Sequence, residues 1–149
     1  MAASRYLVDS NVLIRWVRRE SAEYSVIVGA VSRLAESGSI PCYTSRNLGE
    51  LWNVLTRPAD RNGYGLTPAE ADRRAREIES SLQLLKESPE THDVWRRLLV
   101  DHAVSGAQVH DARIVAAMHV HRVQRILTFN TRDFTRFPGI EAVHPSAAA

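Results

Sequence analysis

Residues 6–14 run Tyr6-Leu7-Val8-Asp9-Ser10-Asn11-Val12-Leu13-Ile14, an apolar segment that stops at a carboxylate and resumes after two small polar residues. The first part is short and β-prone, so it predicts a buried strand. The second part has apolar residues near helical spacing and predicts a buried helix, with Ser10 or Asn11 as its N-cap. Asp9 is therefore expected at the carboxyl end of the strand, where open α/β sheets bind ligands.

Length and composition indicate one soluble domain. The chain has 149 residues and a hydrophobic fraction of 44%, which is ordinary for a globular protein. No apolar run approaches the ~20 residues of a membrane span, and the N-terminus shows no signal-peptide segment. The single cysteine, Cys42, excludes an intrachain disulfide and a cysteine metal cluster. We expect a cytoplasmic protein with no membrane association.

The basic residues are unusual in type. The net charge is only +2, but 18 of the 19 basic residues are arginines and Lys86 is the one lysine. Arginine suits bidentate contacts with phosphate groups. An arginine bias in a GC-rich genome explains the same composition, so charge alone does not identify a nucleic-acid-binding protein.

Apolar periodicity and turn residues predict the remaining elements. Thr67-Pro68-Ala69-Glu70 is a strong helix start, with a capping threonine, a proline at the first helical position and a capping-box glutamate. Helices are expected over residues 22–36, from Ser45 or Asn47 to Leu55, and over 68–87, 91–105 and 112–120; strands over 40–44, 125–129 and 140–143; and a polar turn over 130–134.

Strands separated by helices imply a parallel sheet that is covered on both faces. The prediction is an α/β fold of three layers, α/β/α, with a central parallel sheet of four to five strands. We expect one domain over residues 1–144. The small residues from Pro145 predict a disordered tail over 145–149.

Four acidic residues lie at or beside a predicted strand end or helix start: Asp9, Glu50, Asp111 and Asp133. Clustered carboxylates raise one another's pKa unless a cation holds them, and oxygen ligands suit Mg²⁺ or Mn²⁺. Such an ion can activate water for attack on a phosphodiester.

Each of these acids also has a simpler explanation. Asp9 can cap a helix, Asp111 can favour a helix dipole, and Asp133 can form a turn. Glu50 can pair with Arg46 on the surface of its helix. The spacing between the four is too long for a local motif, so spacing alone leaves the metal cluster and the simpler roles open.

Four motifs, in order, resemble those of the PIN-domain ribonucleases, and most closely the VapC-type toxins of prokaryotic toxin–antitoxin pairs. The first block alone is weak, but four in order are fairly specific, and the resemblance covers nearly the whole chain. The matching stretches are Leu7-Val8-Asp9-Ser10-Asn11-Val12-Leu13-Ile14, Asn47-Leu48-Gly49-Glu50-Leu51-Trp52-Asn53-Val54-Leu55, His110-Asp111-Ala112-Arg113-Ile114-Val115-Ala116-Ala117 and Ile126-Leu127-Thr128-Phe129-Asn130-Thr131-Arg132-Asp133-Phe134.

The resemblance implies a PIN-like fold and metal-dependent endoribonuclease cleavage that leaves 5′-phosphate and 3′-hydroxyl ends. Its acidic pocket corresponds here to Asp9, Glu50 and Asp111, with Mg²⁺ or Mn²⁺ as cofactor. The fourth position is Asn130 or Asp133, because some members carry an acid where this chain has Asn130. The supporting pocket residues are Ser10, Asn11, Thr128 and Asn130.

The resemblance also implies an RNA substrate and a small VapB-type antitoxin, with a homodimer and a toxin–antitoxin hetero-oligomer as the assemblies. The first helix, with Trp16, Arg18 and Arg19, and the predicted 68–87 helix are candidates for the antitoxin groove or the dimer face. Phosphate contacts are expected from arginines near the motifs, although each can equally be a solvated surface residue: Arg15, Arg46, Arg113 and Arg132.

Two other functional classes remain open. An inactive PIN-fold binding module, acting through a protein partner, is suggested by Asn130 at an acid position. A phosphatase or phosphoacceptor of another α/β family would also place an aspartate after the first strand. Such enzymes usually have a second acid two residues later, where this chain has Asn11.

Overall fold

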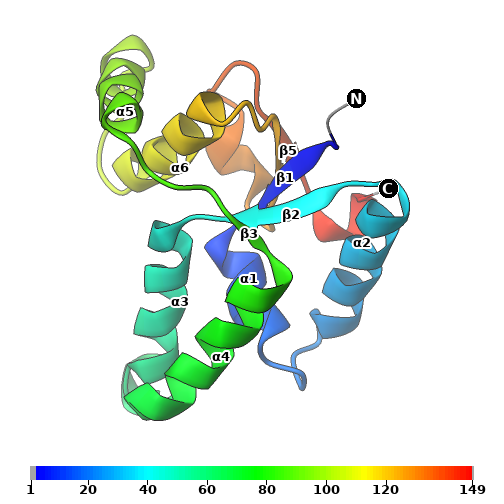
Figure 1. Cartoon of the computed structure of the whole chain (residues 1–149). Helices are drawn as coiled ribbons and strands as arrows, with labels where there is room; N and C mark the ends of the chain where they lie inside the picture. Colours follow the sequence, from blue (N-terminus) through cyan, green and yellow to red (C-terminus); the bar gives the residue numbers. More distant parts are fainter. Residues whose placement is uncertain (1–2, 149) are drawn as a thin grey trace.

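The computed structural model describes residues 3–148. Pairs of α-helices separate the first four strands along the chain, and the elements build one layered structure around a sheet (Figure 1). The elements are β1 (Arg5–Val8), α1 (Ser10–Trp16), α2 (Tyr24–Glu36), β2 (Ile40–Tyr43), α3 (Ser45–Thr56), α4 (Pro68–Ser81), β3 (Gln83–Leu84), α5 (Pro89–Asp101), α6 (Gln108–Val120), β4 (Arg125–Leu127) and β5 (Glu141–Val143), with 3₁₀ turns η1 (Ala59–Arg61), η2 (Thr131–Phe134) and η3 (Pro145–Ala147).

The sheet has five parallel strands in the order β3-β2-β1-β4-β5, so β1 is central. Side chains of β1 alternate between two cores: Tyr6 and Val8 pack with α1 to α4, whereas Leu7 packs with α5 and α6. Figure 1 shows these two groups of helices on opposite sides of the sheet. The predicted three-layer α/β/α fold is confirmed.

The N-cap of α1 is Asp9, the simpler role considered for that residue, and not Ser10 or Asn11. Helix α3 begins at Ser45, one of the two predicted starts; Thr44 caps it, and Asn47 completes a capping box. In both helices the chain enters from a strand, so the last extended residue is the one whose side chain can reach back to the first free N–H groups. The capping box of Thr67 and Glu70 at α4 is as predicted.

The prediction that one helix runs over residues 68–87 is wrong, because α4 ends at Ser81 and Leu82 is extended. Leu82 and Leu85 have helical spacing, but in the structure they pack in the two different cores. An extended segment places residues three apart on opposite faces, so the short β3 between them explains both burials. Helix α5 also ends at Asp101, before the predicted residue 105.

Residues 145–148 differ from the expected disordered tail. They form η3, which packs on α2, where Arg33 donates through its Nε to the carbonyl of Ala148 at 2.6 Å. Ala148 is 3% exposed because it completes the core beside α2. Residue 149 lies outside the described residues. In the described part of the chain, no helix is long and apolar enough to cross a membrane.

Candidate active site

Asp9 lies at the carboxyl end of the central strand and is only 7% exposed. Its backbone N–H still pairs with the carbonyl of Leu127 at 3.0 Å, so β4 holds its backbone. Its Oδ1 accepts from the Ser10 N–H at 2.8 Å and caps α1. The simple capping role and a position in an acidic site are therefore compatible, because Oδ2 points to other partners.

Thr128 and Asn11 hold the second oxygen of Asp9. The Thr128 hydroxyl donates to Asp9 Oδ2 at 2.8 Å, and Asn11 Nδ2 donates to the same oxygen at 3.2 Å. Asn11 also donates to Thr128 Oγ1 at 3.1 Å and accepts from the Phe129 N–H at 3.2 Å. This network ties the start of α1 to the segment after β4 and orients the buried carboxylate.

Asn47 connects Asp9 to α3, a role that the sequence analysis did not assign. It is fully buried and donates from Nδ2 to Ser10 Oγ at 3.1 Å, while its Oδ1 accepts from Thr44. The capping-box spacing of Thr44 and Asn47 was a usable signal for the local role. The contact with Ser10 crosses 37 residues and has no local signature.

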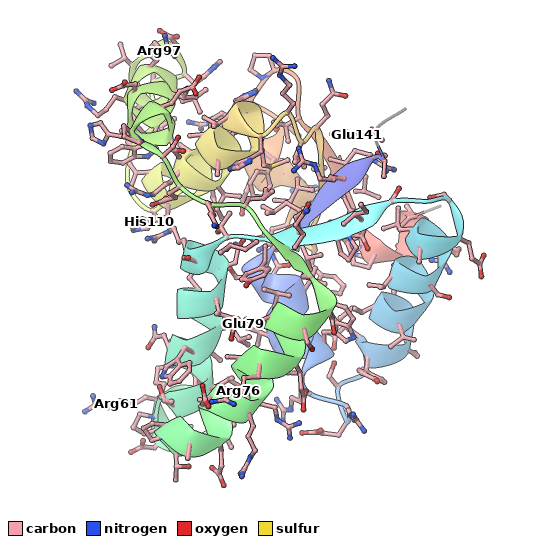
Figure 2. The ribbon with its side chains drawn as sticks, in the orientation of Figure 1. Arg61, Arg76, Glu79, Arg97, His110 and Glu141 are labelled. Carbon is pink, nitrogen blue, oxygen red and sulfur yellow. The ribbon has the colours of Figure 1, made fainter. Side chains whose placement is uncertain are left out.

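Asp111 lies in the first turn of α6 and is half-buried. Figure 2 shows His110, the residue before it, at the end of α6 that lies toward α3 in this view. Burial, followed by the charges of Asp9, Asp133 and Glu50, raises the pKa of Asp111 from 3.8 to about 7. The four predicted carboxylates therefore act on one another electrostatically at the carboxyl edge of the sheet.

The pKa of Asp9 is also raised, from 3.8 to about 6. Burial is the largest cause, and the Thr128 and Ser10 hydrogen bonds oppose it by stabilising the charged form. Glu50 and Asp133 raise the pKa of Asp9 further. Carboxylates with raised pKa values cluster at functional sites, which makes Asp9 and Asp111 candidates for one.

Arg46 lies on α3, one helical turn before Glu50. Its Nε lies 3.4 Å from Glu50 Oε1, which matches the simple pairing considered for Glu50. That Nε is buried and makes no hydrogen bond within the described chain, and its charge lowers the pKa of Asp111. Arg46 thus offsets part of the negative charge of the site without a well-formed hydrogen bond.

The other candidate residues have different environments. Arg113 pairs with Glu87 through two hydrogen bonds of 2.9 and 3.3 Å and stacks on Trp95, so its guanidinium is engaged away from the carboxylates. Arg15 lies over the Phe129 ring, and Arg132 is exposed. Asn130 is also exposed, whereas Asp133 acts electrostatically on Asp9 and Asp111.

The donor set fits a hydrated divalent ion better than a closed metal cage. Among residues 3–148, no three His, Cys, Asp or Glu side chains lie close enough together to hold a metal jointly. Mg²⁺ needs no such cage, because it usually keeps several waters and takes one or two carboxylates plus substrate phosphate. The raised pKa values of Asp9 and Asp111 show the unbalanced negative charge that such an ion would neutralise.

A family model described as the PIN domain matches residues 6–140, which is most of the chain. The chain belongs to the PIN-domain family. The match spans β1 with Asp9, the α3 segment with Glu50, the start of α6 with Asp111, and η2 with Asp133. The predicted family is confirmed, and the PIN domain extends over both cores.

Solved toxin–antitoxin structures share this PIN fold. VapBC2 from Rickettsia felis, bound to a promoter DNA fragment, matches with a TM-score of 0.71 at 14% identity over 94% of this chain and 98% of that chain. VapBC from Salmonella typhimurium, also bound to DNA, gives 0.70 at 18% identity over 95% and 98%. Mycobacterium tuberculosis VapC20, a sarcin–ricin-loop-cleaving toxin, gives 0.58 at 20% identity over 83% and 87%. No curated protein matches the chain.

Proposed function

We propose that this PIN domain is a metal-dependent endoribonuclease toxin of the VapC type, neutralised by a cognate antitoxin. The observation that carries the proposal is that carboxylates from four separate segments act on one another electrostatically, with Asp9 buried and its second oxygen held by the Thr128 hydroxyl. The fold likeness to VapC toxins supports the same activity. We expect the protein to act in the cytoplasm.

Asp9 and Asp111 are the proposed direct ligands of Mg²⁺ or Mn²⁺, and Glu50 and Asp133 would bind through its waters. The bound ion supplies an activated water and stabilises charge on the phosphate. Thr128 and Asn11 keep Asp9 Oδ2 in place. Ser10 and Asn47 keep α3, and so Glu50, in a fixed position relative to α1.

The arginines divide into two groups in this proposal. Arg46, Arg15 and Arg132 are the proposed contacts for RNA, because each lies beside the carboxylates or the segment after β4. Arg113 is left out of the proposed phosphate contacts, since Glu87 already holds its Nε–Nη2 edge in a bidentate pair. Its proposed role is to fix the start of α6, which carries Asp111.

Two neighbouring hollows beside α1 and α4 are the proposed antitoxin surface. One, of about 540 Å³, includes Arg18 and Tyr64, and the other, of about 370 Å³, includes Trp16 and Arg19; Val17 lines both. A small antitoxin, as in the toxin–antitoxin complexes of similar fold, is the proposed occupant. A toxin homodimer is the alternative occupant, and the assembly would be a hetero-oligomer if both surfaces are used.

Expression of the wild type and of Asp9→Ala and Asp111→Ala variants in a bacterial host tests the nuclease. The wild type is expected to arrest growth and to produce new RNA 5′ ends at discrete positions. Both variants are expected to abolish arrest and cleavage. Asp93→Asn, an exposed carboxylate on α5, is the matched control and should behave as the wild type.

Arrest that persists in both variants would contradict the proposal. So would a purified protein that leaves every RNA intact in Mn²⁺ while an active relative cleaves. An inactive PIN-fold binding module would then be favoured, a second candidate that rests on Asn130 at an acid position. Calorimetry separates the two, because a binding module takes up no Mn²⁺ at millimolar concentration. Membership of the PIN family removes the alternative of a phosphatase from another fold.

Trp16→Ala tests the antitoxin surface separately. Trp16 lines the smaller hollow and is partly buried against the core beside α1. The variant is expected to keep its nuclease activity and to lose antitoxin binding in a co-purification assay. If Trp16→Ala changes neither antitoxin binding nor the self-association measured by light scattering, this placement of the partner surface is wrong.

A further inference from the structure

Phe129 follows the acidic site directly and belongs to a stack of planar side chains. The Arg15 guanidinium lies 5.0 Å from the centre of the Phe129 ring, and the His144 ring contacts it edge-on with centroids 5.2 Å apart. Arg15 comes from α1, Phe129 follows β4 and His144 follows β5. Aromatic rings combined with arginine planes are the surfaces on which proteins stack single-stranded bases.

A hollow opens beside this stack and extends to the acidic site. It has a volume of about 410 Å³, within the ~300–1,000 Å³ range of ligand pockets. Phe129, Asn130, Thr131, Arg132 and Asp133 line it, so one wall is an aromatic ring and another is a carboxylate of the site. A group bound here would be the immediate neighbour of a group bound at the carboxylates.

Hydrogen bonds fix the position of this hollow relative to Asp9. The Asn130 N–H donates to Thr128 Oγ1 at 3.0 Å, and that hydroxyl donates to Asp9 Oδ2 at 2.8 Å. The Phe129 N–H donates to Asn11, which also contacts Asp9. Two consecutive backbone groups of the hollow are thus connected to the buried carboxylate through one side chain each, so the spacing between the two sites is rigid.

The polar groups of the hollow match a purine. Asn130 is exposed, and its amide makes no hydrogen bond within the described chain, so it can offer a donor and an acceptor side by side. That pair matches adenine N6 and N7, while an arginine such as the exposed Arg132 matches guanine O6 and N7. Pyrimidines lack an N7 acceptor on the corresponding edge.

A third polar group lies at the stack itself. The Ser146 N–H donates to His144 Nδ1 at 3.1 Å, so a neutral ring carries its proton on Nε2. His144 therefore holds Phe129 at its edge and keeps a donor available. The acidic site by itself recognises only phosphate chemistry and offers no means of distinguishing bases.

We propose that the hollow lined by residues 129–133 binds one purine base of single-stranded RNA, next to the phosphate that is cleaved. The inference rests on the proposed nuclease function and deepens it by assigning base preference to Phe129, Asn130 and Arg132. Stacking on Phe129, whose ring Arg15 also contacts, provides affinity, and the edge contacts of Asn130 and Arg132 select a purine. Because Thr128 links the hollow to Asp9, the base sets which phosphate reaches the carboxylates.

RNA binding by an inactive background, Asp111→Asn, tests the subsite without cleavage. Fluorescence anisotropy is measured with short single-stranded oligonucleotides that differ at one central position, adenosine or guanosine against uridine or cytidine. Purine oligonucleotides are expected to bind about tenfold more tightly, in line with one edge pair. Adding Asn130→Ala and Arg132→Gln together should bring purines and pyrimidines to within about twofold of each other.

Controls separate base reading from charge and folding. Arg97→Gln removes an equal charge at the outer part of α5 (Figure 2) and should leave the purine preference unchanged. Phe129→Leu keeps an apolar group in the partly buried position and should weaken both oligonucleotide classes about tenfold. Phe129→Tyr keeps the ring and should restore binding. Thermal unfolding of each variant checks that the domain folds.

Cleavage of a randomised single-stranded RNA pool by the active protein gives the second readout. Purines are expected beside the cut site in the wild type, and this preference is expected to disappear in Asn130→Ala with Arg132→Gln. Equal binding of purines and pyrimidines by Asp111→Asn, or an unchanged cut-site preference in the double variant, would overturn the subsite. If the wild type binds purines selectively but cleaves nothing in Mn²⁺, the subsite stands and the nuclease proposal fails.

Discussion

Asp9 and Asp111 face the same site from opposite faces of the sheet, and the protein holds them differently. The Asp9 carboxylate is buried and accepts three hydrogen bonds, from Ser10, Asn11 and Thr128. The Asp111 carboxylate is more exposed and accepts none within the described chain. The pKa is nevertheless higher for Asp111, at about 7, than for Asp9, at about 6.

Hydrogen bonds lower the pKa of Asp9, whereas the negative charge of Asp9 is among the causes that raise the pKa of Asp111. Donors aimed at a carboxylate stabilise its charged form and offset part of the cost of burial. Asp111 has only the charge of Arg46 to lower its pKa. In the proposed metal site, Asp9 is therefore the ligand that hydrogen bonds position, while the charge of Asp111 depends more on a bound cation.

The two aspartates should be equally necessary for cleavage despite their different environments. Asp9→Asn and Asp111→Asn are each expected to lower the rate of RNA cleavage in Mn²⁺ by on the order of 10³-fold, because each removes one charge that holds the ion. Single-turnover cleavage of an RNA that the wild type cuts is the measurement. A variant that retains more than about a tenth of the wild-type rate would remove that residue from the ligand set.

Thr128→Val tests the hydrogen bonding that positions the Asp9 carboxylate. The variant keeps the shape of the buried residue but removes the donor to Asp9 Oδ2 and an acceptor for Asn11 and Asn130. Cleavage is expected to fall about 10–100-fold, the usual effect of losing a partner that orients a ligand. The pKa of Asp9 should rise, so the acid limb of the pH–rate profile should move to higher pH.

Thr128→Ser is the matched control, since it keeps the hydroxyl and should retain most of the activity. An acid limb that stays in place in Thr128→Val would show that the hydroxyl does not tune Asp9. Both variants are to be compared by thermal unfolding, because Thr128 is fully buried.

Asp111→Asn tests the raised pKa of Asp111 through its effect on the free energy of unfolding. The folded state raises the pKa of Asp111 above its ordinary value of 3.8, so it binds more protons than the unfolded state between about pH 4 and 7. Metal-free stability should therefore fall as pH rises through this window. At pH 7.5 the variant is expected to be more stable than the wild type by about 1–2 kcal/mol, after allowing for solvent screening.

Urea unfolding in a chelator measures this effect across pH, with Asp93→Asn as the control for loss of one exposed charge. Mn²⁺ should reverse the order by stabilising the wild type and not the variant. Equal metal-free stability of wild type and Asp111→Asn at pH 7.5 would mean that the carboxylate carries no electrostatic strain.

Arg113→Lys tests the support behind Asp111 and should have the smallest effect. Arg113 binds Glu87 with two hydrogen bonds and stacks on Trp95, whose Nε1 donates to the carbonyl of Val109 at the start of α6. Lysine keeps the charge but loses the fork and the stack. Because the Arg113–Glu87 pair is part-exposed, cleavage should fall only about two- to fivefold.

Glu87→Gln should reproduce the Arg113→Lys effect, and the double variant should cost no more than either single change. RNA binding should be unaffected if Arg113 serves only as a support. A large loss of RNA affinity in Arg113→Lys would return this residue to the group of phosphate contacts.

Local patterns explain how much of the fold was predictable. Residues 6–14 carry their own strand-to-helix signal, and Thr67, Pro68 and Glu70 specify a helix start within one turn. These signals succeed because capping and periodicity act between residues that are neighbours in the chain. Periodicity predicted the wrong structure for the extended stretch over Leu82–Leu85, because its apolar spacing fits a helix as well as a strand between two cores.

The sequence by itself determined the layered α/β order, the family and the four acidic residues placed at element boundaries. Only the tertiary structure decided that Asp9 caps α1, that Asn47 reaches Ser10, that Arg113 is engaged by Glu87, and that residues 145–148 pack on α2. These contacts join residues 26 or more positions apart, apart from the Asp9 cap. Periodicity states which face a residue occupies, but it contains no information on which distant side chain meets it there.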